Sequence, residues 1–152
     1  YNYRLSNVLA GLGLSQLKDL DRRIAARRAH FEAYSEAFES LGCVEMMPIH
    51  SPDDANFWLT CLTLTGGAEQ RDTLISAFEA EDMEARPIWK PLHLQPVFAE
   101  CEVFGGAVSE ALFEDGLCLP SGTAMTEAEQ DLVIEGIAVG VLRLGLGGPR
   151  RL

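Results

Sequence analysis

The sequence predicts a small layered α/β domain of the α+β type, in which three to four short strands pack with helices. Hydrophobic residues make up 47% of its 152 residues, which is enough for one compact core. Several long segments place apolar residues at three- and four-residue steps, as half-buried helices do. Between them lie short runs of β-branched, aromatic and other apolar residues, which are typical of strands. Helices that alternate with short strands indicate a layered domain.

Two helices are predicted in the first part of the chain. Residues 6–17 repeat apolar side chains on one helical face, and Ser6 is a suitable N-cap. Residues 19–41 form the clearest helical pattern, with Asp19 able to cap the start and Gly42 fitting the position after the end. The apolar face of this second helix comprises Leu20, Ile24, Phe31, Tyr34, Phe38 and Leu41.

The rest of the chain is expected to alternate between short strands and helices. The expected strands lie within 43–55, where a loop follows, and within 56–65, 83–89 and 116–120; the expected helices cover 68–81, 106–114 and 126–142. Thr126 and Glu129 have the spacing of a capping box, which marks the start of the last helix. Three prolines keep residues 86–98 irregular, because proline cannot continue a helix.

One domain is expected over residues 1–142, followed by a flexible tail over residues 143–152. The chain begins at Tyr1 without a Met, from which we expect a further region upstream in the natural protein. No apolar run reaches the roughly 18 residues that a membrane span needs, and no basic-then-apolar leader opens the chain. Neither membrane insertion nor secretion is therefore expected.

The charge is strongly acidic overall and unevenly distributed. A formal net charge of -11 would repel phosphate backbones, so nucleic-acid binding is not expected. Residues 1–18 and 86–99 nevertheless contain cations and no acid. An acidic protein that binds an anionic ligand needs such acid-free windows, although chance clustering would produce them too.

Four cysteines occur, at positions 43, 61, 101 and 118. None forms a C-x-x-C pair or has a histidine at a zinc-ligand spacing, so no metal site is predicted. Cys61 and Cys118 lie in apolar strand-like runs, where a reduced cysteine behaves as a small hydrophobic residue. We interpret all four as reduced thiols of a cytoplasmic protein.

Four segments occur in an order that identifies a family. They are YNYRLSNVLAGLGLSQL at the start, NFWLTCLTL, ARPIWKPLHLQPVF and FEDGLCLPSGTAMTEAEQ. Together, from residue 1 to about residue 140, they closely resemble the C-terminal region of the DegT/DnrJ/EryC1/StrS aminotransferases. The stretch RPIWKPLHLQPVF is most similar to the subgroup that aminates C4 of a UDP-linked 4-keto-6-deoxy sugar. The resemblance implies the small C-terminal domain of a fold-type-I aminotransferase.

The resemblance also implies a cofactor and a reaction. Enzymes of this family use pyridoxal 5'-phosphate to transfer an amino group from glutamate to a nucleotide-linked keto sugar, and a Schiff-base lysine anchors the cofactor. The chain has two lysines, Lys18 and Lys90, and neither matches the segment of that lysine. We therefore expect no catalytic residue in this chain, and no transaminase activity from it alone. The family further implies a homodimer with the active site at the subunit interface.

Asn2 and Arg4 match the segment that contacts the cofactor phosphate in the family. The resemblance implies that this asparagine reaches the cofactor of the partner subunit. Amide and guanidinium donors suit a phosphate dianion. The alternative is that Asn2 and Arg4 only cap the helix that begins near Ser6.

By resemblance, the acid-free window after residue 85 matches the segment that lines the substrate entrance in this family. Cations together with an indole suit a nucleotide sugar, which carries a diphosphate and flat or apolar faces. The candidate substrate-binding residues are Arg86, Trp89, Lys90, His93 and Gln95, with His93 as the leading polar contact. The alternative is a proline-rich connector in which Trp89 fills the core.

Two further functions are compatible with the sequence. The chain could be a free-standing module that binds a small molecule in the acid-free groove without catalysis. It could also be a dimerisation module in which the helix over residues 19–41 joins two subunits.

Overall fold

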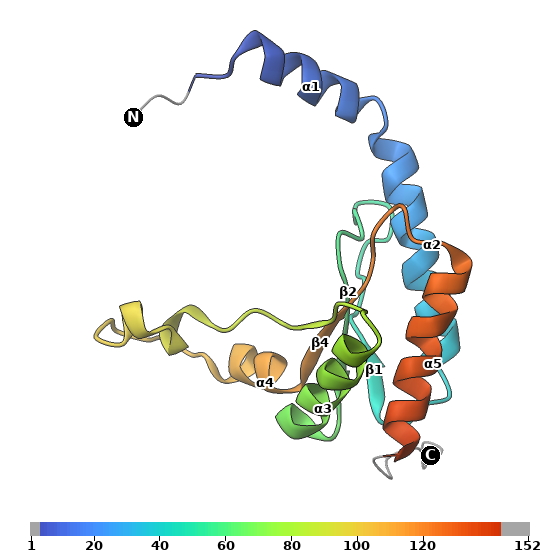
Figure 1. Ribbon diagram of the computed structural model, residues 1–152. Coiled ribbons are helices and arrows are strands. Elements are labelled where there is room, and N and C mark those ends of the chain that lie inside the picture. The colour runs from blue at the N-terminus through green and yellow to red at the C-terminus, as the bar shows by residue number, and fades with distance from the viewer. Residues whose placement is uncertain (1–3, 144–152) are drawn as a thin grey trace.

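The computed structural model describes residues 4–143. Within them the chain forms five helices, four strands and two 3-10 turns (Figure 1). The α-helices are α1 (Asn7–Leu17), α2 (Leu20–Phe38), α3 (Gly67–Ala80), α4 (Ala107–Asp115) and α5 (Glu127–Arg143). The strands are β1 (Val44–Met46), β2 (Thr60–Leu64), β3 (Arg86–Pro87) and β4 (Gly116–Leu119), and the 3-10 turns are η1 (Leu92–Leu94) and η2 (Pro96–Phe98).

The four strands form one sheet in the order β1-β2-β4-β3, and every neighbouring pair is antiparallel. The central pair joins β2 to β4, which lie far apart in the sequence, and β3 is a two-residue edge strand. An antiparallel sheet with helices packed on it is an α+β arrangement, as the sequence predicts.

The core lies on one face of the sheet. Because side chains alternate along a strand, Leu62 and Leu64 of β2 share that face with Leu117 and Leu119 of β4. Helices α2, α3 and α5 cover it with Tyr34, Phe38, Leu74, Phe78, Val133, Ile137 and Val141. Figure 1 shows α2 and α5 side by side beside the sheet. The other face bears Cys61, Thr63 and Cys118.

Two parts of the structure project from this body (Figure 1). The first is α1, whose N-cap is Ser6 as predicted: the Ser6 hydroxyl accepts a 3.2 Å hydrogen bond from the Leu9 amide. No residue of α1 is buried. The second is the segment between β3 and α4, which contains η1 and η2 and remains irregular because of its prolines.

Two predicted boundaries are wrong. The second helix ends at Phe38 instead of residue 41, and Asp19 makes no capping hydrogen bond. Its carboxylate instead binds the guanidinium groups of Arg22 and Arg23, at 2.6 and 3.1 Å. The strand expected from residue 56 begins at Thr60, because Phe57 adopts a left-handed backbone conformation (φ 50°) that interrupts the extended chain.

The first residue of the predicted tail, Arg143, still belongs to α5. The other residues of that tail, 144–152, lie outside the described part. No helix within residues 4–143 is both long and apolar enough to cross a membrane.

Candidate functional site

Three of the predicted substrate-binding residues line one groove along the β3 edge of the sheet. Arg86, Trp89 and Lys90 form part of its wall, and its volume is about 1160 Å³. The opposite wall comes from the segment that joins β4 to α5, including Pro120 and Gly122. The fold therefore brings the acid-free window next to chain segments that are remote from it in the sequence.

The groove contains two tryptophans whose side chains are largely exposed. The ring centroids of Trp58 and Trp89 lie 6.0 Å apart, with 38° between the ring planes. Trp89 is 63% exposed, so the alternative in which it fills the core is wrong. Two exposed indoles side by side offer flat apolar faces for a ring-bearing ligand.

The chain before β2 positions Trp58. The left-handed conformation of Phe57 turns its ring inward, where it packs against Phe31 at 5.4 Å and beneath the guanidinium of Arg28. The Asn56 side-chain oxygen accepts a 3.0 Å hydrogen bond from the Trp58 amide. With Phe57 buried and the backbone fixed, the Trp58 indole faces the groove.

An acidic residue that lies just before the acid-free window contacts the first cation of that window. Glu84 binds the Arg86 guanidinium, with a 2.7 Å hydrogen bond from Arg86 Nε. Lys90 is exposed and makes no ion pair with any residue between 4 and 143. Lys90 is thus the groove cation that is most available to an anionic ligand.

His93 and Gln95 lie outside the lining of the groove. The His93 ring, on η1, forms a 2.8 Å contact through Nε2 with Glu110 of α4. Gly106 packs against the same ring, since a Cβ there would lie 3.0 Å from His93 Cε1. Gln95 donates a 3.4 Å hydrogen bond to the Lys90 carbonyl. The structure thus separates His93 from the tryptophan pair.

The candidate phosphate-binding residues lie at the N-terminal end. Arg4 is exposed and lies two residues before the Ser6 cap, while Asn2 falls outside the described residues. Lys18 follows α1 and is exposed, as Lys90 is. Within residues 4–143 no group of three or more metal-ligating side chains is found. In the groove, Trp58, Trp89 and Lys90 can together bind an anion that has a flat or apolar portion.

Trp58 is a groove residue that the sequence pattern did not predict as part of the site. It was included in the expected strand over residues 56–65, where an aromatic residue needs no other explanation. The available signal was its position beside Phe57, because two successive aromatic residues in a strand point to opposite faces, and one of them must leave the core.

Comparison with known proteins gives a consistent result. The model of the DegT/DnrJ/EryC1/StrS aminotransferase family matches residues 1–138. EpsN of Bacillus subtilis, named as a pyridoxal phosphate-dependent aminotransferase, is 47% identical over 139 residues, which are 89% of this chain and 36% of that protein. The GDP-perosamine synthase of Caulobacter vibrioides is 32% identical over 139 residues, covering 90% of this chain and 38% of the synthase.

Solved structures agree in fold. A DegT DnrJ EryC1 StrS aminotransferase from Brucella abortus is 28% identical and superposes with a TM-score of 0.77, covering 95% of this chain and 37% of that one. Helicobacter pylori PseC, an aminotransferase involved in the biosynthesis of pseudoaminic acid, shares the fold with a TM-score of 0.85 at 14% identity, covering 94% and 39%. The chain thus spans a little over a third of the length of these proteins.

Proposed function

The chain belongs to the DegT/DnrJ/EryC1/StrS aminotransferase family, and from this membership we propose that it is the C-terminal part of a pyridoxal-phosphate-dependent sugar aminotransferase. The proposed reaction transfers an amino group from glutamate to a nucleotide-linked 4-keto-6-deoxy sugar. The observation that carries this proposal is the family match over residues 1–138, which covers nearly the whole chain.

The groove supports a nucleotide sugar as the substrate. Trp58 and Trp89 present adjacent indoles, on which a nucleobase or the apolar face of a sugar can stack. The exposed ammonium of Lys90 follows Trp89 directly and can neutralise one charge of a diphosphate. In this proposal Arg86 contributes only after it exchanges Glu84 for the ligand, because the two side chains are paired. His93 and Gln95 would contact the substrate from outside the groove.

The cofactor would bind mainly to residues outside this chain. Arg4 fits a phosphate group, because a guanidinium offers planar paired donors. Asn2 would add an amide donor toward the cofactor of the partner subunit. When bound, pyridoxal phosphate would supply the amino-group carrier that the transfer from glutamate to the keto sugar needs. We propose that its anchoring lysine lies elsewhere in the enzyme, because neither Lys18 nor Lys90 matches the segment of that lysine in the family.

The surface of α1 supports an assembly larger than this chain. The helix has no buried residue, although it carries Val8, Leu9, Leu12, Leu14 and Leu17, all more than half exposed. Such an apolar surface marks a protein contact. We propose a cytoplasmic homodimer in which this end of the chain contributes to the active site at the subunit interface.

The test compares two proteins: the gene product in its full natural length and the 152-residue chain. Each is incubated with pyridoxal phosphate, glutamate and a UDP-linked 4-keto-6-deoxy sugar, and the amino sugar is measured by mass spectrometry. We expect the aminated product from the full-length protein only.

Two results would overturn the proposal in different ways. Amination by the 152-residue chain would mean that the anchoring lysine is Lys18 or Lys90. If the full-length protein aminates neither UDP-linked nor GDP-linked 4-keto sugars, the proposed reaction is wrong.

A further inference from the structure

Two buried cysteines lie directly opposite each other on the face of the sheet that points away from the core cluster. Cys61 of β2 and Cys118 of β4 are partners in the antiparallel register, although they are 57 residues apart in the sequence. Residues that are directly opposite point their side chains to the same face. Their sulfur atoms are 3.5 Å apart, and either thiol can donate a hydrogen bond to the other.

From this juxtaposition we propose that Cys61 and Cys118 are a reversible oxidation site, at which a peroxide converts the two thiols into a disulfide across the sheet. The inference is independent of the aminotransferase proposal, because it depends only on the pairing of β2 with β4.

The geometry requires only a small movement. Directly opposed residues of an antiparallel pair have Cβ atoms about 4.5–5.5 Å apart, whereas a disulfide needs about 3.5–4.5 Å. The two ranges meet, so a slight approach of the strands allows the sulfur atoms to bond. Cys43 and Cys101 are not register partners of either residue, and Cys101 is exposed on a loop.

The cysteine pair lies apart from the core cluster and next to the groove. Neither Cys61 nor Cys118 belongs to the core cluster, which lies on the other face of the sheet. Both cysteines are 8% exposed, and Cys118 lines the groove, so a small oxidant reaches the pair through Cys118. Arg86 of β3 is the register partner of Cys118 on its other side, so a cation, Cys118 and Cys61 lie in one row across three strands.

The hydrogen bond between the thiols makes them chemically unequal. Donation from the Cys118 thiol lowers the pKa of Cys61 and raises that of Cys118. A thiol with a lowered pKa is the better nucleophile, because the thiolate is the reactive form. Cys61 is the first nucleophile when Cys118 donates, and exchanging the two roles gives the same disulfide.

The chemistry balances with a peroxide as the oxidant. The Cys61 thiolate attacks one peroxide oxygen, the O–O bond breaks, and hydroxide leaves and takes up a proton to become water. Cys118 then attacks the sulfur of the Cys61 sulfenic acid; the S–O bond breaks, a second water leaves and the S–S bond forms. Two thiols give up two electrons in total, and one hydrogen peroxide accepts them. A dithiol such as dithiothreitol reverses the change.

Differential alkylation tests this proposal on the unaltered protein. The protein is treated with one equivalent of hydrogen peroxide, denatured, alkylated, digested with a protease that cleaves after glutamate, which separates all four cysteines, and mapped by mass spectrometry. We expect a peptide pair that is joined through Cys61 and Cys118, with both residues protected from alkylation, and we expect dithiothreitol to restore both thiols. Alkylation of both residues after the treatment, or linkage of either one to Cys43 or Cys101, would overturn the proposal.

Variants provide the matched control. Cys101→Ser should form the same joined peptides, because Cys101 takes no part in the pair. Cys61→Ala should abolish the joined peptides and leave Cys118 alkylatable, since its disulfide partner is gone. A Cys61→Ala protein in which Cys118 is still fully protected would contradict the pairing. Circular dichroism of each variant checks that the fold is retained.

Discussion

The hydroxyl of Tyr34 donates a hydrogen bond of 3.0 Å to the backbone carbonyl of Pro120, which joins α2 to the segment between β4 and α5. Tyr34 is fully buried, and burial raises the pKa of its hydroxyl above the ordinary value. The same segment forms a wall of the groove, so this bond connects the core to the candidate site.

Tyr34→Phe should lower the free energy of unfolding by about 1 kcal/mol, because it removes this hydrogen bond, together with the longer 3.8 Å contact to Met125 Sδ, and keeps the ring packing. Urea denaturation measures the change. Ser35→Ala is the matched control in the same helix: its hydroxyl bonds only to the Phe31 carbonyl one turn earlier, so a change within about 0.5 kcal/mol is expected. Equal effects of the two variants would contradict the role of the Tyr34 hydroxyl.

Gly140→Ala should destabilise the protein, although alanine is the better helix former by up to about 1 kcal/mol. A Cβ at Gly140 would lie 2.2 Å from Cδ2 of the buried Leu74, and overpacking of a core costs about 1–3 kcal/mol. Gly11→Ala in α1 is the control, because nothing lies within 4 Å of its added Cβ. We expect thermal denaturation to show a lower Tm for Gly140→Ala and no loss for Gly11→Ala; a gain for both would mean that α3 and α5 pack less closely than described.

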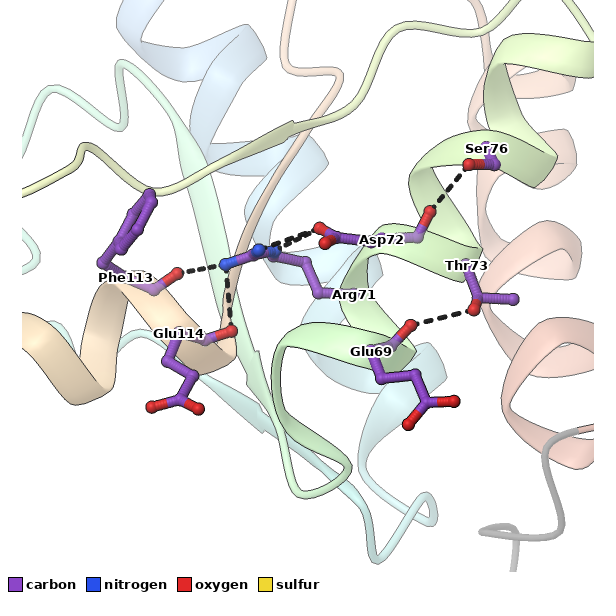
Figure 2. Close-up of polar contacts among 7 residues, drawn as sticks. All are labelled: Glu69, Arg71, Asp72, Thr73, Ser76, Phe113 and Glu114. Carbon is purple, nitrogen blue, oxygen red and sulfur yellow. Dashed lines mark hydrogen bonds and ion pairs between the residues drawn. The ribbon is translucent and has the colours of Figure 1, made fainter.

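Arg71→Met should cost about 1–3 kcal/mol, because it removes the hydrogen bonds that a buried, charged side chain donates to two part-buried carbonyls. Figure 2 shows the Arg71 guanidinium reaching the carbonyls of Phe113 and Glu114 at the end of α4, the latter at 3.0 Å. Arg23→Met is the control, since its ion pair with Asp19 is exposed and contributes little. Urea midpoints that shift equally for both variants would contradict this anchoring of α4.

The capping box of α5 should make stability depend on pH in the acid range. The Thr126 amide donates a 2.7 Å hydrogen bond to the Glu129 carboxylate and lowers its pKa below the usual 4.5. Because the folded-state pKa is the lower one, this stabilisation is complete above pH 4.5 and disappears as the pH falls through the folded-state pKa.

Glu129→Gln should therefore be less stable than the parent protein at neutral pH, and the difference should shrink in acid. Denaturation midpoints between neutral and strongly acidic pH measure it. A difference that stays constant over this range would exclude the charge of Glu129 as its cause.

The groove makes a prediction for the full-length enzyme. Lys90→Met should raise KM for the nucleotide sugar about tenfold or more with a smaller change in kcat, since a charged hydrogen bond contributes about 1.5–3 kcal/mol. Trp89→Ala should raise KM as well. His93→Ala tests the leading polar contact of the sequence pattern. An effect at His93 alone, with Lys90 and Trp89 neutral, would place the substrate on the α4 side instead.

Local patterns in the sequence were sufficient for most elements of the fold. The spacing of apolar residues and the positions of turn residues located five helices and the strands. This works because apolar residues on a buried face recur at the spacing of the helix or strand that carries them. The capping box at Thr126 was also readable, since it depends on residues only three positions apart. The strand from residue 56 was misplaced because the left-handed conformation of Phe57 depends on contacts with α2, which no local pattern contains.

The sequence by itself determined the elements, their order and, through the resemblance, the family. The tertiary structure alone decided which side chains meet. It brought Glu110 to His93, placed Trp58 beside Trp89, and set Cys61 against Cys118. The physical reason is that hydrophobic periodicity is encoded within about ten residues, whereas the pairing of β2 with β4 joins residues more than fifty positions apart.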